Sequence, residues 1–452
     1  MELIRIKDKF SKVGFILAAA GSAVGLGNIW KFPYITGDNG GGVFVLVYLL
    51  TILFIGISVF IAESYIGSKT EQNSVSAFET LASKNKQIWK FGGFTFLTAL
   101  TILAFYVVVI GWILKYIVLS MTHLPSSVAE AETIFMTLLT QDLSSQVFYF
   151  LIAFGIIAYS VSQGVKNGIE KINKILMPAL IGILLFMLFY SMSFDSFTTA
   201  VKFMFAPNFD NFHTESILVA VGHAFFTLSI GMAVILTYSA SMEQNTNIVK
   251  SSIIVALLDT VIALIAGVVI FTILFNAGYE SSQGAGLVFI TLPALFYEFG
   301  IMGNVLAISF FIALAFAGIT SAISILEPGV RYVEEKTTIS RVKATYLLSS
   351  VIVFVGIVSL LSNIENYSEI LKFGSKGLFD WMDYISSAIL LPLGGIITAV
   401  FVGFFIDQNQ LKINMLKFMP EFIYTIWLFS IRFIVPLGVG IVMIEKLGFI
   451  KF

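Results

Sequence analysis

The sequence predicts an all-α membrane protein with about eleven transmembrane helices, of which the first and the sixth are interrupted. Of its 452 residues, 58% are hydrophobic and only 12% are charged, and the mean hydropathy is +0.95. Apolar stretches long enough to cross a bilayer follow one another along most of the chain. Two of these stretches contain clusters of glycine and hydroxyl residues, which weaken a helix. These features exclude an ordinary soluble domain.

The composition also excludes several classes of function. The chain has no cysteine, so disulfides, thiolate metal sites and thiol catalysis are ruled out. Its three histidines are scattered and make no zinc pattern, and no phosphate-binding loop or nucleophile–histidine–acid set is present. The net charge of −1 gives no attraction to nucleic acid. We therefore expect neither an enzyme nor an ATP-driven pump, and no nucleic-acid partner.

The expected spans are separated by connectors too short to hold a soluble domain, so residues 1–452 are predicted to form a single transmembrane domain. The spans cover residues 11–36 (interrupted), 41–68, 91–121, 146–163, 171–193, 214–242 (interrupted), 248–276, 302–335, 344–362, 381–406 and 421–445.

Basic residues concentrate in the connectors on one side of the expected membrane. Lys84, Lys86 and Lys90 follow the second span, and Arg331 and Arg341 belong to the cluster after the eighth. The positive-inside rule then places the N-terminus in the cytoplasm. With eleven spans, the C-terminus lies outside, and we expect a multi-pass protein of the cell inner (plasma) membrane.

The first span contains the stretch AAAGSAVGLGNIWKFP at residues 18–33. Gly21, Gly25 and Gly27 lower its helical stability, and Asn28 follows directly. An opened helix is tolerated in a bilayer only where it is buried in protein or lines a cavity. Freed carbonyls there can coordinate a cation, and a half-helix N-terminus can hold an anionic group. The alternative is close helix packing through small residues.

The sixth span reads HAFFTLSIGMAVILTY and places Thr227, Ser229 and Gly231 at mid-depth. It echoes the first span, and five spans lie between their starts. Interrupted helices at matching positions of two halves indicate a transporter site at the interface of the repeats. We therefore expect a first five-helix repeat at about 11–193, a second at 214–406, and an extra helix at 421–445.

Other polar residues lie within the apolar spans and are candidates for a site. Asp259 in span seven should face a partner, either a cation or, if protonated, a neighbouring helix. Thr320 and Ser321 in span eight offer hydroxyl oxygens to a hard cation, or they simply bond their own helix. Tyr106 is either core packing or a donor to a bound carboxylate. Glu63 lies near a cytoplasmic helix end and could satisfy exposed backbone N–H groups.

The chain contains the segments AGSAVGLGNIWKFPY, NGGG at 39–42, FFTLS at 225–229 and AGITS at 317–321. Through them it resembles the neurotransmitter:sodium symporters, and the resemblance covers nearly the whole chain. The resemblance implies the LeuT fold, a 5+5 inverted repeat plus one extra helix. In having eleven spans, the chain resembles the family's bacterial amino-acid transporters. The resemblance further implies a symporter that imports amino acids with sodium by alternating access.

The resemblance implies two sodium sites. Sodium 1 would be held by Ala23, Asn28, Thr227 and Asp259. Sodium 2 would be held by Gly21, Val24, Ala317, Thr320 and Ser321. Chloride-dependent members have a serine where this chain has Ala263 and a glutamine in place of His223, and only Tyr48 is retained from their chloride cluster. Since Asp259 supplies a fixed charge, no chloride is expected.

The resemblance also implies a substrate pocket. Its residues would be Ala23, Gly25, Leu26, Gly27, Ile102, Tyr106, Phe226, Thr227, Ser229, Met232, Ser321 and Ile325. Monoamine members carry aspartate at the position of Gly25, so the ligand here should bring its own carboxylate, as an amino acid does. The apolar lining favours a hydrophobic or aromatic side chain. Ala233 replaces a family glycine, which leaves the extent of unwinding in span six open.

By the same resemblance, Lys31 and Asp383 occupy the outer gate, and Arg5 and Glu335 the inner gate. A lysine lacks the two-pronged geometry of arginine, so the outer gate should be weaker. Gly168 and Pro178 match an element that unwinds span five in relatives. An amino-acid sensor or a channel-like protein on the same scaffold is the alternative function.

Overall fold

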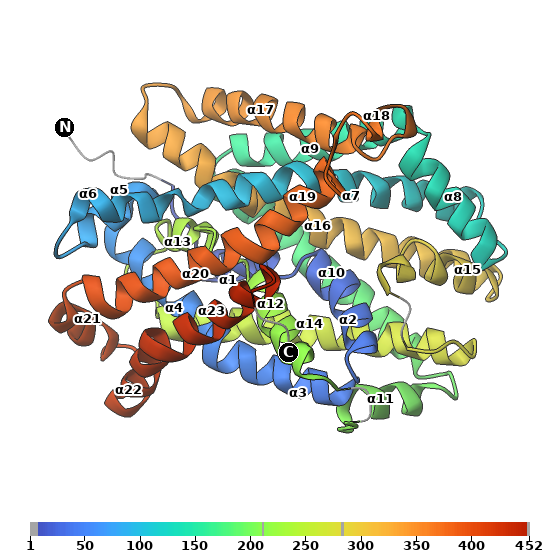
Figure 1. Ribbon diagram of the computed structural model, residues 1–452, viewed down its shortest axis with the longest axis horizontal. Coiled ribbons are helices and arrows are strands. Elements are labelled where there is room, and N and C mark those ends of the chain that lie inside the picture. Colours follow the sequence, from blue (N-terminus) through green and yellow to red (C-terminus); the bar gives the residue numbers. More distant parts are fainter. Residues whose placement is uncertain (1–7, 210–211, 282–283, 450–452) are drawn as a thin grey trace.

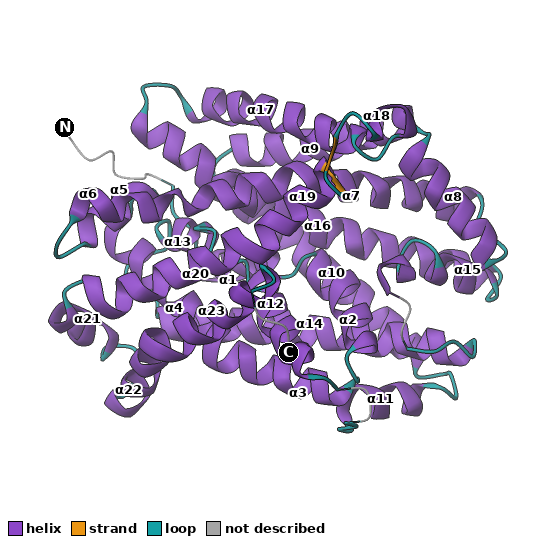
Figure 2. Ribbon diagram, in the orientation of Figure 1, coloured by secondary structure: helices purple, strands orange, loops and turns teal. Residues whose placement is uncertain are grey.

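Stretches rich in apolar residues form helices here because a backbone in hydrocarbon must satisfy its own hydrogen bonds. The computed structural model describes residues 8–209, 212–281 and 284–449. Apart from one two-stranded hairpin, the regular structure in these ranges is helical (Figure 2). The expectation of an all-α membrane protein is therefore confirmed.

Nine helical segments among the described residues are long and apolar enough to cross a membrane, and a bent pair makes a tenth. They are Gly42–Thr70, Lys86–Thr122, Leu143–Ser162, Val165–Ser191, Ile248–Asn276, Ile301–Lys336, Arg341–Leu361, Leu378–Phe405 and Glu421–Lys446, with Lys12–Ala23 and Gly27–Asp38 as the pair. The pair bends by 49° at the predicted break of the first span. The sixth expected span consists of Thr214–Thr227 (α12) and Val234–Ser239 (α13), separated by six non-helical residues, 228–233.

Several spans are built from more than one helix. The first contains α1 (Lys12–Ala23), a π-helical turn η1 (Gly27–Lys31) and α2 (Phe32–Asp38), and the second contains α3 (Gly42–Thr51) and α4 (Ile57–Thr70). The other helices are α5 (Ser74–Leu81), α6 (Lys86–Trp89), α7 (Phe96–Thr122), α8 (Val128–Thr140), α9 (Leu143–Ser162), α10 (Lys171–Ser191), α11 (Phe197–Phe205), α14 (Ile248–Asn276), α15 (Thr291–Tyr297), α16 (Ile301–Lys336), α17 (Arg341–Leu361), α18 (Glu365–Ser368), α19 (Leu378–Ile385), α20 (Leu391–Val400), α21 (Gln408–Met415), α22 (Glu421–Phe429) and α23 (Val435–Lys446). The hairpin pairs β1 (Lys372–Phe373) with β2 (Lys376–Gly377).

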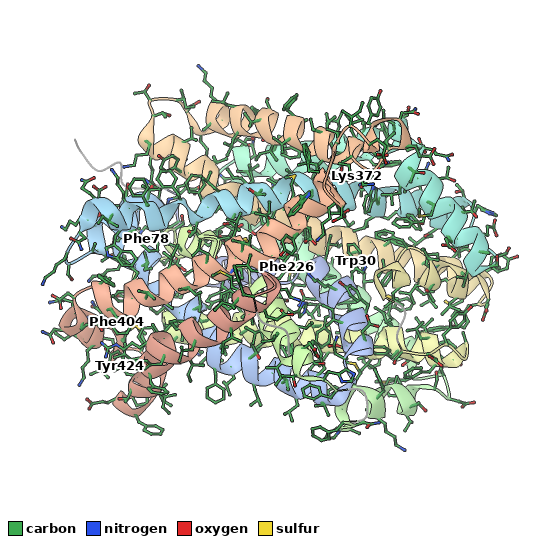
Figure 3. The ribbon with its side chains drawn as sticks, viewed as in Figure 1. Trp30, Phe78, Phe226, Lys372, Phe404 and Tyr424 are labelled. Atoms are coloured by element: carbon green, nitrogen blue, oxygen red, sulfur yellow. The ribbon has the colours of Figure 1, made fainter. Side chains whose placement is uncertain are left out.

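The interrupted helices lie in the middle of an elongated bundle. Figure 1 shows α1, α12 and α13 surrounded by the long helices, with α5, α6 and α21 at one end and α8 and α15 at the other. Phe226, in α12, lies near the centre of the same view, whereas Phe404 and Tyr424 lie toward one end (Figure 3). On outer helices, large apolar side chains such as Phe354 and Leu437 are 69% and 65% exposed, which matches contact with lipid.

Close contacts of α1 with α10 and α16 position the first break. An added Cβ at Gly14 would overlap the Glu170 carboxyl group, and one at Gly21 would lie 2.0 Å from Asn173 Oδ1 and 3.1 Å from Thr320 Cβ. Glycine at these two positions therefore lets α1 approach both neighbours. Ser11 caps the start of α1 by accepting a hydrogen bond from Gly14 N–H at 3.0 Å.

Candidate functional site

The first helix break exposes backbone carbonyls at the end of α1. The N–H of Gly25 donates to Asn28 Oδ1 at 3.0 Å, and the N–H of Leu26 donates to the Tyr106 hydroxyl at 3.1 Å. In a continuous helix these groups would bond the carbonyls of Gly21 and Ser22. The end of α1 therefore presents its partial negative charge to the centre of the bundle, where a cation would be stabilised.

The second break is held open by a buried carboxylate. Glu63 is 1% exposed and accepts hydrogen bonds from Gly231 N–H at 2.7 Å and Leu236 N–H at 3.4 Å. The Ser229 hydroxyl donates to the Ser22 carbonyl at 2.8 Å, so the two breaks are joined directly. Glu63 therefore satisfies backbone N–H groups, but these lie at the second break and not at the cytoplasmic helix end that the sequence predicted.

Positive backbone φ angles let the chain turn through the second break. They occur at Ser229 (53°), Gly231 (82°) and Ala233 (61°). Gly231 lies where an added Cβ would come within 2.4 Å of the Leu391 carbonyl oxygen. The alanine at 233 therefore does not prevent unwinding, although a left-handed conformation is unfavourable for it.

We predict that Ala233→Gly stabilises the protein. A left-handed alanine costs about 1–2 kcal/mol, and the extra freedom of glycine in the unfolded chain takes back about 0.5–1 kcal/mol. The midpoint of thermal unfolding in detergent should therefore rise. Ala240→Gly is the matched control, because Ala240 has an ordinary φ of −69° and its replacement should lower the midpoint. A lower midpoint for Ala233→Gly would contradict the prediction.

Asp259 is fully buried at the centre of a polar cluster contributed by four spans. Its carboxylate accepts hydrogen bonds from Asn28 Nδ2 at 2.7 Å, from the Thr227 hydroxyl at 3.0 and 3.2 Å, and from the Tyr48 hydroxyl at 3.4 Å. Ala23, the fourth residue expected at sodium 1, is buried and lines the adjacent pocket. The structure thus brings the predicted sodium 1 residues together around a carboxylate, the chemistry that a hard cation requires.

The positions that correspond to the chloride cluster of chloride-dependent members have a different chemistry in this chain. Ala263 is buried one helical turn after Asp259 and has no polar group. His223 packs with its ring centroid 5.8 Å from that of Phe32 and 5.5 Å from that of Tyr48. Within the described part of the chain, neither of its ring nitrogens has a hydrogen-bond partner.

The predicted sodium 2 residues lie on α1, in the break that follows it, and on α16. Gly21 and Thr320 face each other across this contact. The Thr320 hydroxyl donates to the carbonyls of Phe316 at 2.9 Å and Ala317 at 3.1 Å, so the alternative of bonding its own helix is also realised. Asn173 Oδ1 is buried beside Gly21 and has no hydrogen-bond partner among the described residues. An unsatisfied oxygen at this place fits a cation.

A small pocket lies between the two breaks. It is lined by Ala23, Gly25, Gly27, Ile102, Tyr106, Phe226, Thr227, Ser229, Met232, Ser321 and Ile325. Of the predicted substrate residues only Leu26 is missing from this lining, and it lines the neighbouring cavity. The pocket measures about 10 Å³, which is room for about one water molecule. A larger ligand must displace the surrounding side chains.

Two larger cavities lie outside this pocket, of about 440 and 190 Å³. Lys31, Phe226 and Asp383 line both of them. Among the described residues Lys31 and Asp383 form no ion pair. The Lys31 ammonium instead lies 4.8 Å from the Phe226 ring centroid, and Asp383 accepts a hydrogen bond from the Ser387 hydroxyl at 3.2 Å. The expected outer pair is therefore not closed.

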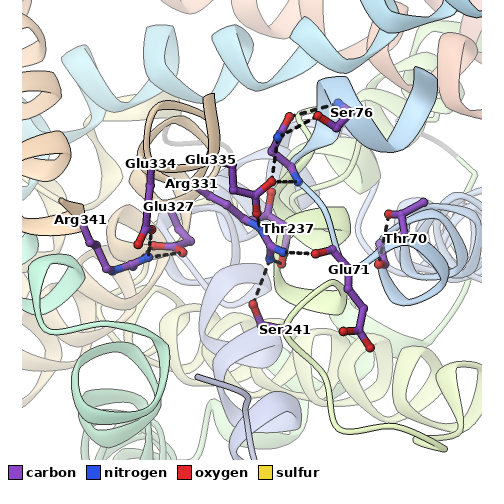
Figure 4. Close-up of polar contacts among 12 residues, drawn as sticks. Thr70, Glu71, Ser76, Thr237, Ser241, Glu327, Arg331, Glu334, Glu335 and Arg341 are labelled. Atoms are coloured by element: carbon purple, nitrogen blue, oxygen red, sulfur yellow. Dashed lines mark hydrogen bonds and ion pairs between the residues drawn. The ribbon is translucent and has the colours of Figure 1, made fainter. Parts of the chain in front are cut away.

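On the opposite side of the pocket, Glu335 binds partners that the sequence did not suggest. Its carboxylate accepts from Arg331 Nε at 2.8 Å and from both Asn73 N–H and Asn73 Nδ2 at 2.7 Å (Figure 4). Arg5, the expected partner, lies outside the described residues. Arg331 was expected in a connector, but it lies within α16 and is 3% exposed. This corrects the sequence assignment.

The span-five element is helical in this structure. Gly168 lies in a π-helical turn, Val165–Glu170, where an added Cβ would come within 1.9 Å of the Ser160 carbonyl oxygen. Pro178 lies inside the continuous helix α10. The roles of both residues stay predictions.

Comparisons with known proteins agree on one group. The model of the sodium:neurotransmitter symporter family matches residues 7–137 and 136–451. The chain is 34% identical to the sodium-dependent transporter YhdH of Bacillus subtilis over 451 residues, which cover 98% of each. It is 31% identical to a sodium-dependent transporter of Haemophilus influenzae over 456 residues, 97% of each. The crystal structure of MhsT with L-phenylalanine superposes with a TM-score of 0.88 at 37% identity, covering 97% of this chain and 100% of MhsT.

Proposed function

Since the chain belongs to the sodium:neurotransmitter symporter family, whose members include sodium-dependent transporters, we propose that it imports hydrophobic or aromatic L-amino acids with two sodium ions by alternating access and without chloride. The observation that carries the proposal is the pocket between two broken helices, which has apolar walls and polar ends.

The two ends of the pocket suit the two charges of an amino acid. Carbonyls at the end of α1 would attract the ammonium group, and the half-helix that starts at Gly27 would attract the carboxylate. Gly25 brings no side-chain charge, so the ligand must supply both. Ile102, Met232 and Ile325 line the pocket and favour an apolar side chain. The MhsT complex contains L-phenylalanine, an amino acid of this class.

Coupling to sodium would supply enough energy for accumulation. One charge crossing 100 mV is worth about 2.3 kcal/mol, so two sodium ions contribute about 4.6 kcal/mol. This corresponds to roughly a thousandfold accumulation of a neutral substrate. The fixed carboxylate of Asp259 and the apolar Ala263 support independence from chloride.

We propose a cytoplasmic N-terminus and an outside C-terminus in the plasma membrane. Lys84, Lys86 and Lys90, which lie in and beside α6, support this orientation by the positive-inside rule. Within the span order we assign two five-helix repeats at about 11–193 and 214–406 and an extra helix at 421–445.

Uptake into proteoliposomes tests the proposal. Radiolabelled tryptophan, tyrosine, leucine, methionine and alanine are offered with sodium outside, or with sodium replaced by potassium. We expect sodium-dependent accumulation of the larger side chains, unchanged when chloride is replaced by gluconate. Binding that depends on sodium but gives no accumulation would indicate a sensor, and a loss of uptake in gluconate would contradict the chloride assignment.

We also predict that Lys31→Ala reduces uptake several-fold and leaves the protein folded. The ammonium over the Phe226 ring contributes about 0.5–1 kcal/mol at an exposed site and up to about 2 kcal/mol when desolvated. Its loss should free Phe226 and mainly raise the apparent KM. Lys115→Ala is the control, since Lys115 lies 5.9 Å from the Tyr149 ring and away from the pocket. Unchanged uptake by the Lys31 variant would exclude a gate role.

A further inference from the structure

Arg331 joins three segments on the inner side of the bundle. Its Nη1 donates to the Thr237 carbonyl and the Ser241 hydroxyl, both at 3.0 Å, and its Nη2 donates to the Glu71 carbonyl at 2.8 Å. Its Nε bonds Glu335 of its own helix at 2.8 Å. Figure 4 shows the guanidinium between the end of α13 and the end of α4.

The acceptors are the groups that a helix end leaves unsatisfied. Thr237 is among the last four residues of α13, and Glu71 is the left-handed residue that ends α4, with φ 53°. Carbonyls at these positions have no partner within their own helix and carry partial negative charge. A cation with five donors in one plane matches several such carbonyls better than an ammonium would. Arg331 therefore caps two helices at once.

The capped helices form one structural unit, and Arg331 belongs to another. Gly67 of α4 allows a close approach of the Leu236 carbonyl of α13, and Glu63 of α4 bonds backbone groups on both sides of the start of α13. α16, which carries Arg331, packs most extensively against α7 and α10, and its contact with α13 is much smaller. Alternating access moves one such unit against the other around a fixed site. The contacts of Arg331 with Thr237, Ser241 and Glu71 cross this boundary.

Further contacts involve the same two helix ends. The Ser241 carbonyl accepts from Phe10 N–H at 2.9 Å, and Lys9 forms an ion pair with Glu71 at 2.7 Å. A second ion pair, between Arg341 and Glu327, joins α16 to α17 and does not reach α13. Among the side chains drawn in Figure 4, Arg331 is the one whose bonds reach α13 and α4 together.

We propose that Arg331 is a positioning residue that holds the inner side closed by fastening the end of α13 and the end of α4 to α16. The inference rests on the proposed alternating access. Loss of the guanidinium should shift the protein toward the inward-open form, because water can then replace its contacts.

The absence of native cysteine allows a direct test, since a single introduced thiol is the only one in the protein. Ser239 in α13 is 1% exposed, and its hydroxyl has no partner among the described residues, so Ser239→Cys removes no hydrogen bond. Ser359→Cys in α17 is equally buried and unpartnered and reports general unfolding. N-ethylmaleimide labelling of purified protein, without sodium or substrate, measures both.

We expect Arg331→Ala to raise the labelling rate of Ser239→Cys at least tenfold and that of Ser359→Cys less than twofold. Ser241→Ala, which removes one acceptor and keeps the charge, should raise the Ser239→Cys rate two- to fivefold. Arg432→Ala is the matched control, because Arg432 bonds the Gly403 carbonyl and Gln408 and makes none of the three cross-boundary contacts. It should leave the Ser239→Cys rate unchanged.

An unchanged Ser239→Cys rate in both variants would overturn the proposal, and so would an equal increase at Ser359→Cys, which indicates a merely structural role. In uptake assays, Arg331→Ala should raise the apparent KM for sodium more than it lowers the maximal rate. The labelling result does not depend on any transported substrate. If the proposed transport function were wrong, the labelling result would still hold. Failure of the transport proposal can therefore be distinguished from failure of the Arg331 proposal.

Discussion

Replacing Asp259 by asparagine is expected to weaken the apparent affinity for sodium by one to two orders of magnitude and to abolish concentrative uptake at low sodium. The carboxylate is fully buried and takes hydrogen bonds from Asn28, Thr227 and Tyr48. An interaction with a charged partner contributes about 1.5–3 kcal/mol, which is roughly a 10- to 150-fold change in a binding constant. The amide keeps the shape and removes the charge.

Sodium titration of uptake measures the effect, with circular dichroism and gel filtration as checks on folding. Asp142→Asn is the control, since Asp142 caps α9 outside the membrane and lies far from the pocket in the chain. If the Asp259 variant kept the wild-type sodium dependence, the assignment of sodium 1 would be wrong. A variant that loses sodium dependence but still binds substrate would locate the coupling at this carboxylate.

Gly25→Ala is the second substitution with a large expected effect. Its Cβ would lie 2.8 Å from the Tyr106 hydroxyl and 3.3 Å from Ser321 Cβ and Oγ, inside a pocket that has almost no free volume. Forcing a methyl group into a packed site costs about 1–3 kcal/mol, and here the same space is needed for substrate. We expect uptake to fall at least tenfold while the protein stays folded.

Gly155→Ala provides a matched control, because it makes the same chemical change in transmembrane helix α9, where no atom lies within 4 Å of the added Cβ. Its uptake should equal that of the wild type. Binding of labelled substrate at saturating sodium separates a blocked pocket from a misfolded protein. Full uptake by the Gly25 variant would place the substrate elsewhere.

The helix breaks could be predicted because the sequence carries their cause. Three glycines and an asparagine within one apolar run predicted the first break, and the structure ends α1 at Ala23. Thr227, Ser229 and Gly231 did the same for the second, which follows α12. The family model and the match to MhsT bear out the resemblance and the LeuT fold.

Contacts that depend on where separate helices end could not be predicted in this way. In the sequence Arg331 is one basic residue of a connector, and no spacing reveals that it bonds the backbone carbonyls of Thr237 and Glu71. Asn173 lies between Gly168 and Pro178 in a stretch that also holds Glu170, Lys171 and Lys174, so nothing in the sequence singled out its amide. Lys31 and Asp383 line the same two cavities, but the Lys31 ammonium lies over the Phe226 ring and forms no ion pair with Asp383 among the described residues.

The small size of the central pocket should limit the leak of ions across the membrane. Room for about one water molecule cannot hold a continuous column of water across the bundle. Ions therefore find no wet path through the bundle in this arrangement of the helices. A membrane containing many copies would keep its ionic gradient at rest, and the electrical leak per molecule would stay far below that of a channel.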